Sequence, residues 1–155
     1  MRGDRFDHGP RKQRSDGSLA VYLAGRFERR DELRQIAWEL EEAGWTIASS
    51  WLFVDSALGP DGLVAGGRAT HIAEADLRDL RNADLCVSFT EHAGGPLGRG
   101  GRHFELGVAT ALGLRTVIVG PLEHVFHCLD GMEIYATWTD ARRALQLPSN
   151  AIQAA

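Results

Sequence analysis

The sequence predicts a three-layer α/β protein in which a parallel sheet of five strands is covered by helices on both faces. Two observations lead to this prediction. Short apolar segments alternate with amphipathic segments from residue 19 to residue 147. The apolar segments are hydrophobic almost without interruption, which is typical of strands buried on both faces of a parallel sheet.

The expected strands are residues 19–24, 45–50, 84–89, 115–119 and 133–135. The expected helices are 31–43, capped by Asp31, then 70–82, capped by Thr70, then 103–113, and a last helix capped by Thr139 or Asp140 that ends near Leu147, with a helical turn at 121–129. Leu33, Ile36, Ala37 and Leu40 share one face of the first helix, so we expect them in the core. The glycine-rich residues 54–68 predict a mobile loop.

A chain of 155 residues fits one domain, with 19–147 as the folded part, 1–18 as a disordered basic arm and 148–155 as a tail. The arm carries five basic and three acidic residues, whereas the remainder has a net charge of −6. An acidic body argues against a nucleic-acid partner.

A location in the cytoplasm, away from membranes, is expected because the chain has neither a long apolar stretch nor a signal sequence. Cys86 and Cys128 lie among apolar residues and are expected to be buried free thiols. Trp38 and Trp45 are expected in the core.

Ligands of open parallel sheets bind beyond the carboxyl ends of the strands. Gly25 follows the first strand, and Arg26 and Arg29 lie just after it, so this turn could hold an anion. Neither a dinucleotide-binding fingerprint nor a P-loop is present. An ordinary turn with solvated arginines explains the same residues equally well.

Two carboxylates stand out as candidates for chemistry. Five glycines lie between residues 94 and 101, and Glu105 follows in what we expect to be the first turn of a helix. The helix dipole there would favour an ionised carboxylate, which could act as a nucleophile or simply complement the dipole. Asp76 is either a general acid that faces the cleft with Glu105 or a surface residue like Glu74 and Asp79.

Histidine and tryptophan residues offer weaker signals. His124 and His127 are three residues apart, but the spacing of the sequence supplies no third ligand, so no metal is expected. His103 adjoins the glycine-rich segment and could bind a phosphate or a base. Trp51 follows a strand and is either a stacking platform for a base or part of the core.

Taken together, the motifs resemble those of the nucleoside 2-deoxyribosyltransferase family and its relatives, the deoxynucleoside 5′-monophosphate N-glycosidases. The resemblance covers residues 19–147 and depends on the order of four segments, Tyr22-Leu-Ala-Gly25, Asp76-Leu-Arg-Asp-Leu-Arg-Asn-Ala-Asp84, Gly101-Arg-His-Phe-Glu-Leu-Gly-Val-Ala109 and Leu114-Arg-Thr-Val-Ile. The motif Gly-Pro-x-Glu-x-Val-Phe-His and a late Tyr-x-Thr-Trp are similar to those of small members encoded by phages and actinobacteria.

The resemblance implies a flavodoxin-like, Rossmann-like fold and cleavage of the bond between a base and deoxyribose. Glu105 would be the nucleophile at C1′, Asp76 would hold or protonate the substrate, and Tyr22 would orient the nucleophile. Asp84 would be structural. The implied partners are a nucleoside or nucleotide and a nucleobase, in a homodimer or larger homo-oligomer without a cofactor.

Four more residues complete the expected substrate site, as phosphate or sugar contacts of the glycine-rich segment and its helix: Arg99, Gly101, Arg102 and His103. The sequence departs from the transferases, because the segment 98–100 lacks the Asp that they use on the base and no Asn-x-Met matches the one that a neighbouring subunit lends. It departs from the N-glycosidases by carrying Arg26 where they place serines. Both base exchange and hydrolysis therefore remain open, as do a non-catalytic nucleotide-binding or sensing module and a structural or virion role.

Overall fold

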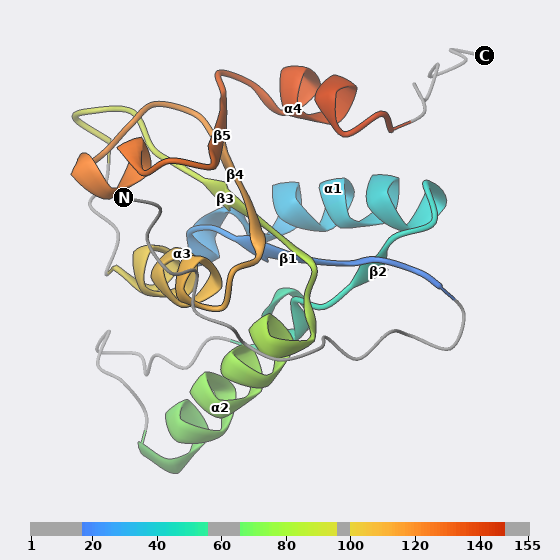
Figure 1. Cartoon of the computed structure of the whole chain (residues 1–155). Coiled ribbons are helices and arrows are strands. Elements are labelled where there is room, and N and C mark those ends of the chain that lie inside the picture. The colour runs from blue at the N-terminus through green and yellow to red at the C-terminus, as the bar shows by residue number, and fades with distance from the viewer. Residues whose placement is uncertain (1–16, 56–65, 96–99, 148–155) are drawn as a thin grey trace.

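The computed structural model describes residues 17–55, 66–95 and 100–147. Five parallel strands form one sheet, as predicted, and the structure shows their order to be β2-β1-β3-β4-β5 (Figure 1). The strands are β1 (Ala20–Ala24), β2 (Thr46–Ile47), β3 (Leu85–Phe89), β4 (Arg115–Val119) and β5 (Met132–Tyr135).

Helices cover both faces of the sheet, which confirms the three-layer prediction (Figure 1). The α-helices are α1 (Arg30–Glu42), α2 (Gly66–Asn82), α3 (Gly101–Ala111) and α4 (Trp138–Ala144). Three 3₁₀ helices lie between them, η1 (Phe27–Arg29), η2 (Ser50–Phe53) and η3 (Val125–Cys128). On one face α1 and α4 are joined by a hydrogen bond of 3.1 Å that Trp138 Nε1 donates to Glu39, and on the other face α2 packs against α3.

The strand order reverses between β1 and β3, which is where ligands of doubly wound sheets bind. The chain leaves the carboxyl end of β1 toward α1 on one face and leaves β3 toward α3 on the other face. Every residue of β1 and β3 is buried. The predicted core residues of α1 are buried as well: Leu33, Ile36, Ala37 and Leu40.

Several predicted boundaries of helices and strands were wrong. The strand expected at 45–50 pairs only over β2, because the Ser49 hydroxyl, rather than a further strand residue, accepts a hydrogen bond from the Leu23 amide. The last helix is capped by Thr137, whose hydroxyl accepts from the Asp140 amide at 3.2 Å. Asp31 lies inside the first turn of α1, where it pairs with Arg34. Helix α2 begins at Gly66, before Thr70.

Two side chains expected to be buried lie at the surface. Cys128 is exposed at the end of η3, whereas Cys86 is a buried free thiol on β3 as predicted. Trp38 is 48% exposed on α1, but Trp45 packs against the core. The tail 148–155, residues 1–16 of the predicted arm and residues 56–65 of the predicted loop lie outside the described residues. Within the described part, no helix has the length and apolar character needed to cross a membrane.

Candidate active site

The tyrosine and the glutamate that the sequence singled out meet on one side of the sheet. The Tyr22 hydroxyl donates a hydrogen bond of 3.1 Å to Glu105 Oε1, which links central strand β1 to helix α3. Tyr22 is fully buried, so its ring is held by the core. The charge of Asp76, on α2, raises the pKa of both Tyr22 and Glu105, which places the two carboxyl groups in one electrostatic environment.

Both carboxyl groups hold their protons more tightly than free carboxylic acids do. Burial is the main cause for Glu105, followed by the charge of Asp76, and it raises the Glu105 pKa to about 8 even though the Tyr22 hydrogen bond lowers it. Burial and the charge of Asp79 raise the pKa of Asp76 to about 7. Burial also raises the pKa of Tyr22, so its hydroxyl remains a donor at neutral pH.

The raised pKa of Glu105 corrects the expectation that the helix dipole keeps this carboxylate ionised. Helix α3 begins at Gly101, so Glu105 is in its second turn rather than its first. The field of the helix dipole falls off within the first turn. Burial therefore dominates, and the free protein carries a protonated Glu105 for most of the time at pH 7.

Asp79 supports the site through hydrogen bonds to η2 and is not the solvated surface charge that the sequence suggested. Its carboxylate accepts hydrogen bonds from the Ser50 amide at 2.9 Å and from the Ser50 hydroxyl at 2.6 Å, which ties α2 to η2. Asp76 Oδ1 is buried and has no hydrogen-bond partner among the described residues. A donor from a substrate would satisfy this oxygen.

The arginines that follow β1 are not equivalent. Arg29 is engaged on three sides, because it bonds both carboxylate oxygens of Glu32, the Thr90 carbonyl at 3.2 Å and Glu91 at 3.2 Å. It therefore clamps the ends of β1 and β3 together. Arg26 pairs at 3.2 Å with Glu28, and its buried Nε has no partner within the described part of the chain.

The structure places the expected substrate contacts of the glycine-rich segment in different environments. Arg102 is buried and forms an ion pair with Glu123, so its charge is already used inside the protein. Gly101 begins α3, and Arg99 lies outside the described residues. Gly25 is needed for packing, since a Cβ there would come within 2.5 Å of Leu33 Cδ1.

Trp51 lies in the core, which is one of the two roles that its position in the sequence left open. Its side chain is 8% exposed, and its Nε1 donates a hydrogen bond of 2.8 Å to the Leu23 carbonyl. Phe27, which the sequence did not single out, lies three residues after the end of β1, is 39% exposed and packs against Trp51. An aromatic residue in the turn that follows the first strand was the signal available for it.

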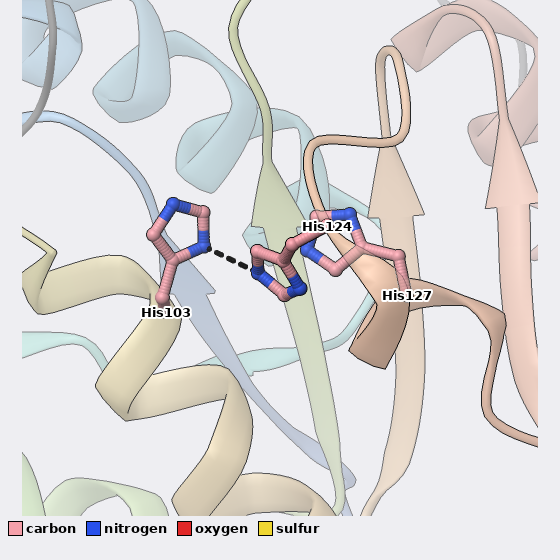
Figure 2. A group of neighbouring side chains, drawn as sticks. All are labelled: His103, His124 and His127. Carbon is pink, nitrogen blue, oxygen red and sulfur yellow. Dashed lines mark hydrogen bonds between the residues drawn. The ribbon is translucent and has the colours of Figure 1, made fainter.

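Three histidines that are separate in the sequence gather beside α3. His103 lies in the first turn of α3, and His124 and His127 lie at η3 (Figure 2). His124 Nε2 and His103 Nδ1 are 3.0 Å apart. Burial, followed by nearby positive groups, lowers the pKa of His103 and lowers that of His127 to about 4. Spacing in the sequence does not reveal His103 as the third member of the cluster, because only folding brings His103 close to His124 and His127.

A search of solved structures finds a fold relative. A CMP N-glycosidase from Clostridium botulinum matches with a TM-score of 0.54 and 21% identity, over 83% of this chain and 99% of that protein. At this identity the match establishes a shared fold. No family model and no curated protein matches the sequence.

Proposed function

We propose that the protein cleaves the N-glycosidic bond of a 2′-deoxynucleoside or its 5′-monophosphate, with Glu105 as the nucleophile. The observation that carries this proposal is the Tyr22 hydroxyl bonded to Glu105 beside Asp76, at the point where the strand order reverses. The solved structure with the same fold is that of an enzyme that acts on CMP, which supports a nucleotide as substrate. A paired nucleophile and acid is the equipment that cleavage through a glycosyl-enzyme requires.

In the first step the bond between C1′ and the base nitrogen breaks, and its electron pair leaves with the base. Asp76, with a pKa of about 7, gives its proton to the departing base. The Glu105 carboxylate forms a new bond from its oxygen to C1′, which yields a glycosyl ester. Tyr22 holds one oxygen of Glu105, so the other oxygen is the one that bonds to carbon.

In the second step an acceptor attacks C1′ and Glu105 leaves as a carboxylate. Asp76, now ionised, takes the proton of the acceptor. Water as the acceptor gives hydrolysis, and a second base gives transfer. Arg26 is a better donor to a 5′-phosphate than Arg29, because Arg29 is held by two carboxylates.

The other reading is a nucleotide-binding or sensing module without catalysis. The observation that favours it is the Glu105 pKa of about 8, because a protonated carboxyl group is not a nucleophile. Tight binding of an unaltered nucleotide, with no free base after long incubation, would support this reading.

The test incubates purified protein with each nucleoside and each 5′-monophosphate, ribo and deoxy, with and without a second free base. Chromatography measures released base and new nucleoside. Glu105→Gln is the inactive variant, and Glu74→Gln, an exposed carboxylate on α2, is the matched control. Base release by the wild type and by Glu74→Gln, reduced at least about a thousandfold in Glu105→Gln, supports the proposal. Equal release by the two variants contradicts it.

A further inference from the structure

The histidine cluster beside α3 has the geometry of a metal site. One ring nitrogen from each of His103, His124 and His127 lies within 4.8 Å of the other two. Figure 2 shows the three rings turned toward one another, with His103 on α3 and the other two on the segment between β4 and β5. Two nitrogens bound to one tetrahedral zinc ion are about 3.3 Å apart, given Zn–N bonds of about 2.0–2.1 Å. His103 Nδ1 and His124 Nε2, at 3.0 Å, are close to that separation.

The cluster leaves nitrogen atoms without hydrogen-bond partners in a buried setting. His127 is fully buried, and neither its Nε2 nor His124 Nδ1 has a partner among the described residues. Buried polar atoms are normally satisfied. A cation at the centre of the three rings would supply the missing partner of His127 Nε2.

The surroundings supply the outer contacts that metal-binding histidines usually have. Glu123 Oε2 is 3.8 Å from His103 Nε2, on the opposite side of the ring from Nδ1. At that distance the carboxylate makes no hydrogen bond to the ring, but its charge favours a cation bound at Nδ1. Arg102 holds the same carboxylate in an ion pair. The Glu123 amide donates to His127 Nδ1 at 3.2 Å; coordination through Nε2 would place the ring proton on Nδ1, so this bond has to break when the ion binds.

We propose that His103, His124 and His127 bind one divalent cation of the class that favours imidazole nitrogen, with Zn²⁺ as its representative. Three protein ligands leave a fourth position for water or another small ligand. A groove of about 680 Å³ adjoins the cluster, lined by His103 and His124 and by apolar side chains such as Phe104 and Leu129.

The cation would fasten the connection between β4 and β5 to the helix that carries Glu105. In an α-helix, residues two positions apart point in nearly opposite directions. His103 and Glu105 are such a pair, so the ion would lie across α3 from the two carboxyl groups. The proposal is therefore independent of the glycosidase function and can fail or succeed without it.

The test is equilibrium dialysis of the tag-free, full-length protein against Zn²⁺, with the bound metal counted per chain. His124→Gln and His127→Gln remove one ligand each, and circular dichroism checks that each variant is folded. His71→Gln and His92→Gln are the matched controls, since both are exposed histidines elsewhere on the chain. Co²⁺ replaces Zn²⁺ in a second experiment, because its visible absorption distinguishes tetrahedral nitrogen coordination from hydrated surface ions.

The expected result is one ion per chain and a loss of at least about tenfold in affinity when His124 or His127 is replaced, with no change in the controls. Strong visible absorption of the Co²⁺ form of the unaltered protein, lost in the folded His124→Gln variant, gives the same conclusion. Absence of saturable binding by the unaltered protein would overturn the proposal. Unchanged affinity in His124→Gln and His127→Gln would also overturn it.

Discussion

The Tyr22 hydroxyl is hydrogen-bonded to Glu105 Oε1 at 3.1 Å, and this bond joins the middle of the sheet to the second turn of α3. Tyr22 is fully buried and its raised pKa keeps it a donor, so the bond stabilises the ionised form of Glu105 against the effect of burial. The proposed nucleophile is thus held in place by a residue that is fixed by the core. This relationship leads to the first prediction.

Tyr22→Phe removes the hydroxyl and leaves the ring. The Glu105 pKa should rise, because the hydrogen bond that lowers it is lost. A hydrogen bond to a charged group contributes about 1.5–3 kcal/mol, so kcat/KM should fall by about 10–100-fold. Steady-state kinetics across pH measures both effects. An unchanged acidic limb in the pH profile would show that Tyr22 does not act on Glu105.

The pH dependence of the reaction should be bell-shaped. The active form carries one proton on the pair of carboxyl groups, with Glu105 ionised and Asp76 protonated; because Asp76 has the lower pKa, this is the minor of the two arrangements of that proton. The pair loses its first proton near the lower of the two pKa values, about 7, and its second near about 8, so kcat/KM should be highest between these values. Below this range the nucleophile is protonated, and above it the acid is lost.

The matched variant for this profile is Asp76→Asn. It removes the acid, so the alkaline limb should disappear. It also removes the charge that raises the Glu105 pKa, so the acidic limb should move to lower pH. A profile in which the alkaline limb persists unchanged would exclude Asp76 as the acid.

Glu105→Gln should stabilise the protein at alkaline pH. In the unfolded chain Glu105 ionises near its ordinary pKa of 4.5, whereas in the folded protein it keeps its proton until about pH 8. The folded state binds more protons over this interval, so wild-type stability falls as the pH rises from about 4.5 to about 8. The glutamine variant lacks this loss.

Thermal unfolding at pH 5 and at pH 8.5 measures the difference. We expect Tm of Glu105→Gln to exceed that of the wild type by at least about 2 °C at pH 8.5, the change that ~1 kcal/mol gives in a chain of this size. The two proteins should differ less at pH 5. A difference that is equal at both pH values would mean that Glu105 is not held protonated by burial.

The two arginines after β1 should respond differently to replacement. Arg26→Gln should raise KM for a 5′-monophosphate by about tenfold and leave KM for the nucleoside unchanged, because one charge-assisted contact to phosphate is lost. Arg29→Gln should lower Tm, because it removes the clamp between the ends of β1 and β3. If both variants changed KM equally for the nucleoside and for the monophosphate, neither arginine would be a phosphate contact.

The sequence was sufficient to predict the sheet, whereas the roles of Glu105 and Asp76 stay predictions. Strands that are apolar almost throughout, such as residues 85–89, and the stripe of Leu33 and Leu40 on α1 are set by local periodicity, and the structure confirms them. The Tyr22 contact with Glu105 agrees with the pairing implied by the order of the motifs. Tertiary hydrogen bonds decide how much of a predicted strand joins the sheet. The hydrogen bond that the Ser49 hydroxyl accepts just after β2 is an example.

Most errors at the site concern contacts between residues that are distant in the sequence, whereas the Thr137 cap of α4 is a local contact. The raised pKa of Glu105 depends on its burial and on the charge of Asp76. The position of Glu105 in a helix reveals neither of these causes. Asp79 looked like a surface charge because its partner, Ser50, is 29 residues away. The same reason concealed His103 from the pair formed by His124 and His127.

Mass spectrometry of the protein quenched with acid during turnover would detect the glycosyl-enzyme itself. A fraction of the chains should be heavier by the mass of one glycosyl group, with the added mass on the peptide that contains Glu105. The adduct should be absent from Glu105→Gln and present in Glu74→Gln. Release of base by the wild type with an adduct on another residue, or with none under rapid quenching, would contradict a glycosyl-enzyme on Glu105.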